Sequence, residues 1–491
     1  MGEKKEQDEK KDDIYRGNTT LHQLGGRVKL RYEAIADWVV LRQREKPIAR
    51  VFHVAYLAKS RAARPLTFVF NGGPGAASAY LHMGALGPQR AAFNEDGSLP
   101  KPPVQLKDNA ESWLRFTDLV FIDPVGTGFS RTVEEEPKSE DKREGDRKPN
   151  SEFWAVDRDL ESLGEFMQKF LSAHGRWKSP VFIAGESYGG FRVAKLARLA
   201  QERYGIGLSG AILISPAIEF ASLMGSDYNL MHWVETLPSM AATAWVHQRD
   251  YRSGRRSSLA TYLRQAETFA LDELLPLVAR GASLDGHRRQ EILERLARLV
   301  GLDEAWVVRS AGRIDRRAFA RELLREDRRY CGLYDASLTA VDPFPDRSNY
   351  QGPDPTLAAL DRIFRAGINA HLRENLGVQT ELDYELLSYE VHQQWKAQEG
   401  GFIRPQIGSM DDLRYGMVLN PHMRVCISHG YFDLVTPYFS SDRLVEHMKL
   451  DVSLRDNLQV QHYPGGHMFY TWAASRKAFC KDIEKLYREA V

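Results

Sequence analysis

The sequence is short of several features that would assign it to a class at once. Its 491 residues include three cysteines, Cys331, Cys426 and Cys480, which are far apart and odd in number. They form neither a disulfide framework nor a C-x-x-C metal pattern, so we expect three buried thiols. No apolar run is long enough to cross a membrane as a helix, and no H-E-x-x-H or Walker-type run indicates metal or nucleotide chemistry.

An excess of charge of one sign is also missing. The chain has 67 basic and 66 acidic residues, which gives a formal net charge of +1. That balance favours neither nucleic acid nor an anionic membrane as a partner. The N-terminus, Met1-Gly-Glu-Lys-Lys-Glu, lacks the apolar core of a signal peptide. It predicts a cytoplasmic protein if this N-terminus is native, and a periplasmic or secreted one if a leader was removed.

The hydrophobic residues, 43% of the chain, are enough for one large core and an added domain. Residues 1–17 are a mixed-charge tail that we expect to be disordered. Strand and helix patterns alternate in residues 18–216 and 400–491, which predicts an α/β fold with a mostly parallel central sheet. Residues 217–399 have helical patterns and are interpreted as a helical cap inserted between core strands. The charged residues 133–150 are expected to form a mobile, solvated loop, with a lid beside the site as the alternative.

The strand and helix patterns also predict where the core elements lie. Three β-like runs at residues 28–32, 38–41 and 48–57 alternate in polarity, which predicts antiparallel strands with one wet face. The remaining core strands are expected at residues 65–70, 118–122, 181–184, 210–215, 423–428 and 459–463, and the main core helices at residues 153–171, 190–203 and 473–487.

The chain is organised around the stretch Val181-Phe-Ile-Ala-Gly-Glu-Ser-Tyr-Gly-Gly190. An apolar strand pattern ends in G-x-S-x-G, and a helical pattern follows at once. A nucleophile elbow needs this context, because its serine stands on a strained turn above the sheet with the hydroxyl exposed. The flanking glycines allow the strand and helix backbones to approach closely. We therefore predict Ser187 as a nucleophile.

A serine nucleophile needs a base and a carboxylate that orients the base. In this type of fold the chain order is serine, acid, histidine. Two loops that follow predicted strands fit this order, and they place Asp433 as the acid and His467 as the base. His429 is a weaker candidate because it precedes Asp433. One oxyanion donor is expected at the amide of Tyr188, and the other in the glycine-rich loop after residues 65–70.

These motifs together resemble the serine carboxypeptidase family, peptidase family S10, within the α/β-hydrolase fold. Two runs resemble the bacterial branch of this family more than its secreted eukaryotic members. They are Phe68-Val-Phe-Asn71, which leads into the glycine-rich loop, and Gly430-Tyr-Phe-Asp433. The matching runs, in family order, are Asn71-Gly-Gly-Pro-Gly75, Leu86-Gly-Pro88, Asp123-Pro-Val-Gly-Thr-Gly-Phe-Ser130, Gly185-Glu-Ser-Tyr-Gly189, the Asp433 loop and Gly466-His-Met468.

The resemblance implies removal of C-terminal residues from peptides, without a cofactor. It implies that Asn71 and Glu186 bind the terminal carboxylate of the peptide substrate, and that the amides of Gly73 and Tyr188 form the oxyanion hole. A glutamate must be protonated to donate to another carboxylate, which favours acid conditions because its ordinary pKa is about 4.3. The 217–399 insertion resembles the family's cap, which shapes the pocket.

The sequence departs from the family pattern at three positions. The glutamate that precedes L-G-P in many members is Ala85, the tryptophan two residues before the loop asparagine is Val69, and the usual cysteine of the loop is Ala76. The family's disulfides are therefore absent. Loss of the partner carboxyl removes a like charge that would raise the pKa of Glu186, which predicts less preference for acid than in the family.

Two other functions are compatible with the same residues. An esterase or an acyltransferase uses the same triad and the same fold, and only an exopeptidase requires a free carboxylate on its substrate. A non-catalytic binding protein on a hydrolase scaffold is the other alternative, and the complete set of Ser187, Asp433, His467 and Gly73 argues against it. The sequence leaves open whether the protein forms a homodimer.

Overall fold

The protein is described from a computed structural model, which covers residues 14–25, 29–60, 63–133, 152–249, 258–396 and 407–491. Most of the tail expected at residues 1–17 and nearly all of the loop expected at residues 133–150 lie outside these described residues. The expected change from cap to core at residues 399 and 400 also lies outside them.

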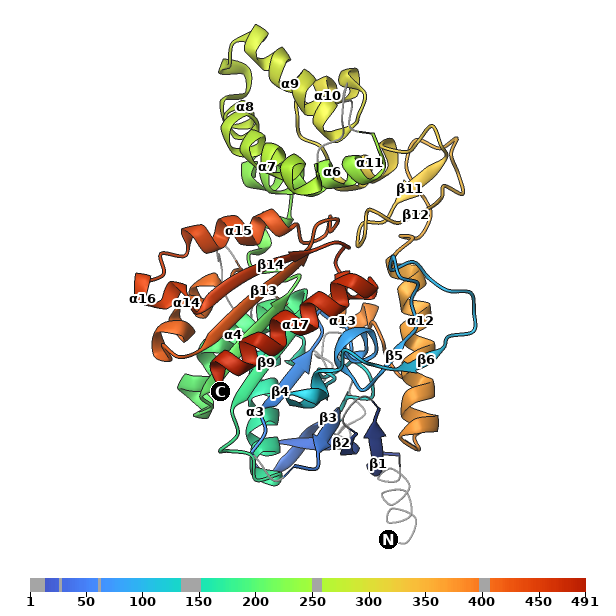
Figure 1. The fold of residues 1–491 in the computed structure, drawn as a ribbon, viewed down its shortest axis with the longest axis vertical. Coiled ribbons are helices and arrows are strands. Elements are labelled where there is room, and N and C mark those ends of the chain that lie inside the picture. The colour runs from blue at the N-terminus through green and yellow to red at the C-terminus, as the bar shows by residue number, and fades with distance from the viewer. Residues whose placement is uncertain (1–13, 26–28, 61–62, 134–151, 250–257, 397–406) are drawn as a thin grey trace, which may run out of the picture.

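A mixed sheet forms the centre of the molecule (Figure 1). Its order is β1-β2-β3-β7-β4-β9-β10-β13-β14, and the strands from β7 to β14 run parallel to their neighbours. The three strands at the other edge are antiparallel, as is the pairing of β3 with β7. The strands are β1 (Asn18–Leu24), β2 (Leu30–Gln43), β3 (Lys46–Ala58), β4 (Leu66–Phe70), β7 (Asp118–Ile122), β9 (Val181–Glu186), β10 (Leu208–Ile214), β13 (Arg424–Gly430) and β14 (Leu458–Tyr463).

Helices cover both faces of this sheet because its central strands are apolar on both sides. Strand β4 and strand β7 are buried at every position, as expected for parallel strands between two helical layers. On one face they pack with α3 (Val156–Ala173), α4 (Tyr188–Tyr204) and α14 (Met410–Leu419). On the other face they pack with α12 (Leu357–Ala370) and α17 (Ala473–Ala490). The predicted α/β-hydrolase fold with a mostly parallel sheet is confirmed.

The N-terminal strands differ from the prediction. The runs at residues 28–32 and 38–41 are not separate strands, because β2 continues from Leu30 to Gln43. The intervening residues alternate between buried and half-buried positions, with Ala34 and Ala36 facing the core. They extend the strand because β3 supplies a hydrogen-bonding partner along its length. Helix α3 also begins at Val156 rather than at residue 153.

The cysteines are free thiols. Cys331 and Cys426 are buried as expected, whereas Cys480 is only half-buried. Cys480 lies on α17, where one side of its helix faces the core and the other faces solvent. The expectation of a buried thiol is therefore wrong for Cys480.

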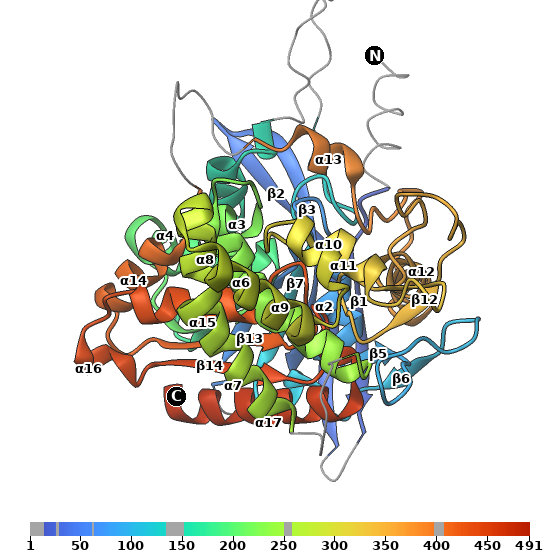
Figure 2. The ribbon, with the colours of Figure 1, turned by 90° about the horizontal axis from the view of Figure 1, so that it is seen from above.

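Most of the 217–399 segment forms a helical body beyond the carboxyl ends of the strands (Figures 1 and 2). Its elements are α6 (Leu230–Val246), α7 (Leu259–Phe269), α8 (Leu275–Arg280), α9 (Gly286–Val300), α10 (Glu304–Arg309), α11 (Arg316–Glu322) and the small pair β11 (Arg329–Cys331) and β12 (Thr339–Val341). Helix α12, from the same segment, instead packs beside the core sheet. The domain boundaries at residues 216 and 399 remain a proposal.

Partly buried polar contacts join the helical body to α15 (Tyr438–His447), the helix that follows β13. Glu235 of α6 pairs with Arg443 of α15. The Tyr438 hydroxyl donates to Glu267 of α7 at 2.7 Å. Apolar residues of the loop after β13 belong to the core of the helical body. The helical body is therefore anchored on the loop that carries the predicted acid.

The other described α-helices and strands are short. They are α2 (Ala79–Leu81), β5 (Gln89–Ala91), β6 (Leu106–Asp108), β8 (Arg131–Thr132), α5 (Phe220–Leu223), α13 (Tyr389–Gln394) and α16 (Val452–Arg455).

Candidate active site

The predicted nucleophile stands on a strained turn between β9 and α4. Ser187 has φ 61° and ψ −123°, a conformation that costs an L-residue on the order of 1–3 kcal/mol. Its amide donates to Ile214 and its carbonyl accepts from Gly190 and Ala217, so the neighbouring strand and helix fix the turn. A Cβ on Gly185 would lie 2.2 Å from the Gly189 carbonyl oxygen. The sharp turn thus needs glycine there, and Ser187 is half-buried between buried neighbours.

The predicted acid and base meet beyond the ends of β13 and β14. Nδ1 of His467 lies 2.7 Å from Oδ2 of Asp433, and both side chains are buried. Oδ1 of Asp433 accepts from the amides of Val435 at 2.7 Å and Thr436 at 3.0 Å. A carboxylate only accepts hydrogen bonds, so Nδ1 carries the proton and Nε2 is free to act as a base.

Ser187 and His467 occupy the same edge of the sheet. Ser215 follows β10, the strand beside β9, and its hydroxyl donates to the His467 carbonyl at 2.7 Å. Thr436 donates to the Ser215 carbonyl at 3.0 Å. These contacts connect the Asp433 loop, the His467 loop and the strand next to the elbow.

Burial and charge act in opposite directions on His467. Burial by itself would lower its pKa, but the Asp433 carboxylate and, more weakly, Glu186 favour the imidazolium, and the pKa ends above its ordinary value of 6.5. The carboxylates therefore stabilise the cation that forms when His467 takes a proton.

Three neighbours of this pair were not predicted from the sequence. The Thr436 hydroxyl lies 2.7 Å from Asp433 Oδ2 and 3.0 Å from His467 Nδ1. The Tyr334 carbonyl accepts from the His467 amide at 2.5 Å, and its ring packs edge-on against the imidazole. Nη1 of Arg316, at the start of α11, lies 3.1 Å from the Val435 carbonyl oxygen. Tyr334 and Arg316 come from the 217–399 segment, so that segment helps to hold both loops.

The loop after β4 packs directly on the elbow. A Cβ on Gly72 would lie 2.4 Å from the Tyr188 amide nitrogen, so only glycine allows this approach. The predicted oxyanion donors, the amides of Gly73 and Tyr188, are thereby held on adjoining backbone segments. Tyr188 is also the first residue of α4, where helix amides lack intrahelical partners.

The two predicted carboxylate-binding residues contact each other. Nδ2 of Asn71 lies 2.5 Å from Oε2 of Glu186, and Oδ1 of Asn71 accepts from the Leu81 amide. Oε1 of Glu186 is buried and has no hydrogen-bond partner among the residues that the structure describes. The Tyr470 hydroxyl approaches Glu186 and contributes to its pKa, but it is not in hydrogen-bonding geometry.

Burial raises the pKa of Glu186 to about 7, partly opposed by His467, Tyr470 and Asn71. The sequence suggested that Ala85 would leave this carboxyl without the environment that favours its protonated form. In the structure, burial of Glu186 favours its protonated form instead. This burial could not be deduced from the residue at position 85. The protonated form of Glu186 thus persists close to neutral pH.

His429, the weaker candidate for the base, is used elsewhere. It lies on β13 itself, and its Nε2 contacts the Ser441 hydroxyl at 2.8 Å. Burial lowers its pKa to about 3. His429 therefore packs in the sheet as a neutral side chain.

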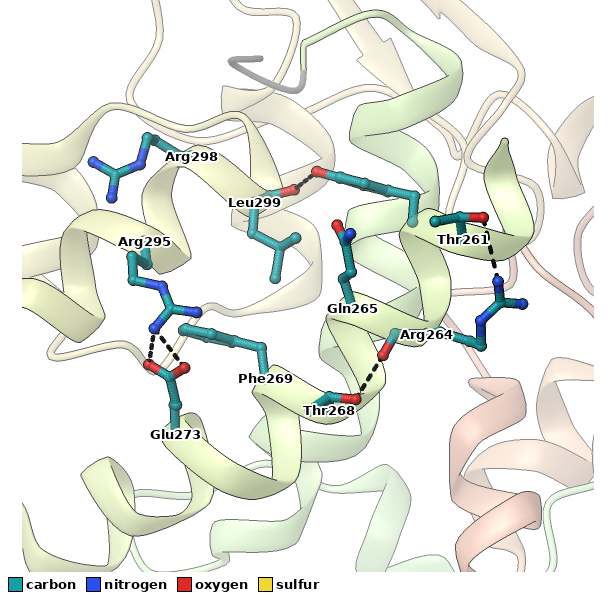
Figure 3. A pocket seen from close by; sticks show the side chains of 10 residues that line it. Thr261, Arg264, Gln265, Thr268, Phe269, Glu273, Arg295, Arg298 and Leu299 are labelled. Atoms are coloured by element: carbon teal, nitrogen blue, oxygen red, sulfur yellow. Dashed lines mark hydrogen bonds and ion pairs between the residues drawn. The ribbon is translucent and has the colours of Figure 1, made fainter. Parts of the chain in front are cut away.

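A cavity of about 720 Å³ opens between α7 and α9 of the helical body (Figure 3). Its lining includes Arg264, Phe269, Arg295 and Arg298, and Glu273 pairs with Arg295. None of the predicted site residues lines it. Among the residues that the structure describes, no cluster of three His, Cys, Asp or Glu side chains is arranged to hold a metal ion. No helix in the described part of the chain is long and apolar enough to span a membrane.

Comparison with known proteins shows a similarity to one protein family. Residues 32–249 match the sequence pattern of the family described as "Serine carboxypeptidase". That part of the chain is similar in sequence to serine carboxypeptidases. The matched residues include Ser187 and the glycine loop, whereas Asp433 and His467 lie beyond them. Their assignment therefore depends on the contacts described above.

The relationship to individual serine carboxypeptidase relatives is distant. "Serine carboxypeptidase-like 46" of Arabidopsis thaliana is 28% identical over 251 residues, 48% of this chain and 49% of its own length. "Serine carboxypeptidase-like 33" of the same plant is 35% identical over 159 residues, 30% of this chain and 27% of its own. The chain spans less than half the length of these curated relatives.

Solved structures also align with the chain at low similarity. VinJ is 13% identical, covers 92% of this chain and 99% of its own, and gives a TM-score of 0.37. A soluble variant of monoglyceride lipase from Saccharomyces cerevisiae is 12% identical, covers 93% of this chain and 95% of its own, and gives 0.35.

Proposed function

We propose that this serine carboxypeptidase-like protein removes C-terminal residues from peptides through an acyl-enzyme. The observation that carries the proposal is the pairing of Asn71 with a buried Glu186 immediately before Ser187. A triad alone fits any acyl transfer, but an amide and a protonated carboxyl beside the nucleophile suit a free carboxylate. The bacterial branch of the family remains a prediction, supported by the Phe68–Asn71 run and the free thiols.

Each residue then has one chemical role. Ser187 attacks the scissile carbonyl as His467 Nε2 takes its proton, while Asp433 holds the imidazole in the required tautomer. The amides of Gly73 and Tyr188 stabilise the oxyanion. His467 next protonates the leaving amine, which departs with the C-terminal residue. Water then attacks the acyl-enzyme with His467 as base, and Ser187 is regenerated.

The proposed carboxylate capture requires Glu186 to keep its proton. Oε2 accepts from Asn71, so a proton on the unpartnered Oε1 is the one that a substrate carboxylate can accept. Above the Glu186 pKa of about 7, two carboxylates would face each other and repel. One N–H of the Asn71 amide is engaged with Glu186, and the second N–H alone would not offset that repulsion.

We therefore expect a bell-shaped dependence of kcat/KM on pH with its maximum near neutral. The acid limb reflects His467, whose pKa lies above 6.5 and which must be neutral to act as base. The alkaline limb reflects loss of the Glu186 proton near pH 7. Initial rates on one free-acid peptide from about pH 5 to about pH 9 test both limbs. A sharp maximum below about pH 5, the ordinary glutamate range, would contradict this assignment.

Glu186→Gln is expected to remove the alkaline limb and to leave the acid limb in place. A glutamine amide donates at every pH in the range, so capture no longer depends on a proton. The variant should have a higher KM at low pH, because its neutral amide donor is weaker than a carboxylic acid. Glu202→Gln, on the exposed side of α4, is the matched control and should keep both limbs. An unchanged alkaline limb in Glu186→Gln would assign that limb to another group.

The decisive test of the proposed function compares each peptide as free acid and as C-terminal amide. Mass spectrometry should show stepwise shortening of the free acids, little cleavage of the amides, and no cleavage of either by Ser187→Ala. Equal cleavage of acids and amides would exclude carboxylate capture. Cleavage of neither form, with labelling of Ser187 by a fluorophosphonate, would favour the esterase or acyltransferase alternative. Absence of labelling would favour the non-catalytic alternative.

A further inference from the structure

One buried arginine contacts both segments that supply the proposed oxyanion amides. Arg192 lies on α4, five residues after Ser187. Its Nη1 donates to the Asn71 carbonyl oxygen at 2.5 Å and lies 3.5 Å from that of Gly72. Its guanidinium carbon lies 4.8 Å from the centre of the Tyr188 ring, within the range of a cation–π contact.

Asp159 of α3 fixes the direction of this guanidinium. Its two carboxylate oxygens accept from Nε at 2.7 Å and from Nη2 at 3.0 Å. The Arg192 and Asp159 side chains are 1% and 3% exposed. A buried pair of this kind is a weak source of stability, because the loss of hydration offsets the attraction. We therefore expect the Arg192–Asp159 pair to matter mainly for the backbone that it positions.

What it holds is the orientation of two peptide units. The carbonyl and N–H of a trans peptide unit point in opposite directions, and the Gly72–Gly73 bond is trans. The Gly72 carbonyl accepts from the Ala76 amide at 3.1 Å and also faces Arg192. The Gly73 N–H must then point away from Arg192. A turn of the Gly72 carbonyl would take the Gly73 N–H out of position, and a turn of the Asn71 carbonyl would shift the peptide unit before it.

We propose that Arg192, fixed by Asp159, is the positioning residue of the oxyanion hole. This inference rests on the proposed hydrolase function, because it assigns what orients the Gly73 amide of the oxyanion hole. Arg192 acts through the backbone and through the Tyr188 ring, not on the substrate. Its loss should therefore lower kcat and affect KM little. One oxyanion donor is worth on the order of 10²–10³ in kcat, and a misdirected Gly73 amide should cost about that.

The test replaces both charges together, as Arg192→Met with Asp159→Leu. Apolar side chains of similar size usually preserve stability when they replace a buried ion pair, so the melting temperature should stay near that of the wild type. The kcat should fall on the order of a hundredfold. The affinity for a peptide boronic acid, whose tetrahedral adduct with Ser187 mimics the oxyanion, should fall in parallel. Arg198→Lys, an exposed arginine on the same helix, is the control and should change neither value.

A purely structural role predicts a different result. In that case the stable double variant keeps the wild-type kcat and boronate affinity, and this result overturns the proposal. If the double variant does not fold, Arg192→Lys takes its place. A lysine ammonium lacks the planar fork of arginine and cannot contact Asp159 and the Asn71 carbonyl at the same time. The kcat should therefore fall again, while KM stays unchanged. Wild-type kcat in Arg192→Lys would overturn the proposal as well.

Hydrogen exchange separates failure of this inference from failure of the proposed function. Peptides that cover residues 66–86 should exchange faster in the double variant, because the loop carbonyls lose their anchor, while α17 stays unchanged. This measurement needs no catalytic activity, so it tests whether Arg192 anchors the loop even if the wild type hydrolyses no peptide and resists a fluorophosphonate. Unchanged exchange in residues 66–86 would overturn the positioning role.

Discussion

Replacing Ser187 with alanine is expected to lower kcat by on the order of 10⁶, the loss seen when the nucleophile of such a triad is removed. Acyl-enzyme formation needs the hydroxyl, and no neighbouring side chain replaces it on the strained turn. The substrate carboxylate should still bind, because Asn71 and Glu186 are untouched. The variant and the wild type should therefore have the same dissociation constant for an uncleaved free-acid peptide.

The measurement combines single-turnover kinetics with calorimetric titration of an uncleaved peptide. Ser283→Ala removes an exposed serine of the helical body and should leave kcat and affinity unchanged. Retained hydrolysis in Ser187→Ala would show that another group supplies the nucleophile. The removed hydroxyl also relieves no strain, because the φ of 61° belongs to the backbone, so the melting temperature should change little.

The parts of the site that lie within one short stretch could be predicted from the sequence. The strand, turn and helix around Ser187 follow from a local pattern, and β9 and α4 lie within a few residues of their predicted bounds. The loops of Asp433 and His467 also follow strands at the expected places. Parallel strands bring their carboxyl ends to one edge of the sheet. Local patterns therefore located these side chains, and the sheet brought the loops together.

Contacts between distant segments could not be predicted in this way. The Tyr334 carbonyl reaches the His467 amide from a segment that had only helical patterns to identify it. Asp159 of α3 contacts Arg192 of α4. The sequence predicted both helices, but not how each is rotated about its axis relative to the other. Such pairs have no sequence signature, because their spacing is set by packing. The elevated pKa of Glu186 is of the same kind, since burial depends on the whole fold.

The fold shows the same division. The central strands are apolar along their length, and the pattern gave their positions. The continuity of β2 was missed because residues 33–37 lie between the two predicted runs, although the strand continues through them with alternating half-buried and buried positions. Helix α12 has the same kind of amphipathic pattern as the helices of the helical body, yet it packs on the core sheet. Periodicity reports that a helix has an apolar face, but not which partner covers it.

Asp433→Asn is expected to lower kcat by about 10⁴, although the replacement is nearly isosteric. The amides of Val435 and Thr436 both donate to Oδ1, so the asparagine carbonyl oxygen should take that position. Its NH₂ group then faces His467 Nδ1 and donates to it. This forces the proton of the neutral imidazole onto Nε2, and Nε2 can no longer accept the Ser187 proton.

The pH profile distinguishes this tautomer effect from a loss of folding. Without the Asp433 carboxylate, burial is left to dominate and the pKa of His467 should fall below 6.5. The acid limb of kcat/KM should therefore move to lower pH. The melting temperature should change little, because the two amides still donate to the asparagine oxygen and the Thr436 hydroxyl can donate to the Ser215 carbonyl instead. His462 and Asp442 form a second pair at 3.0 Å outside the site, so Asp442→Asn is the matched control with unchanged kcat. An Asp433→Asn variant that keeps the wild-type kcat and acid limb would remove Asp433 from the proposed triad.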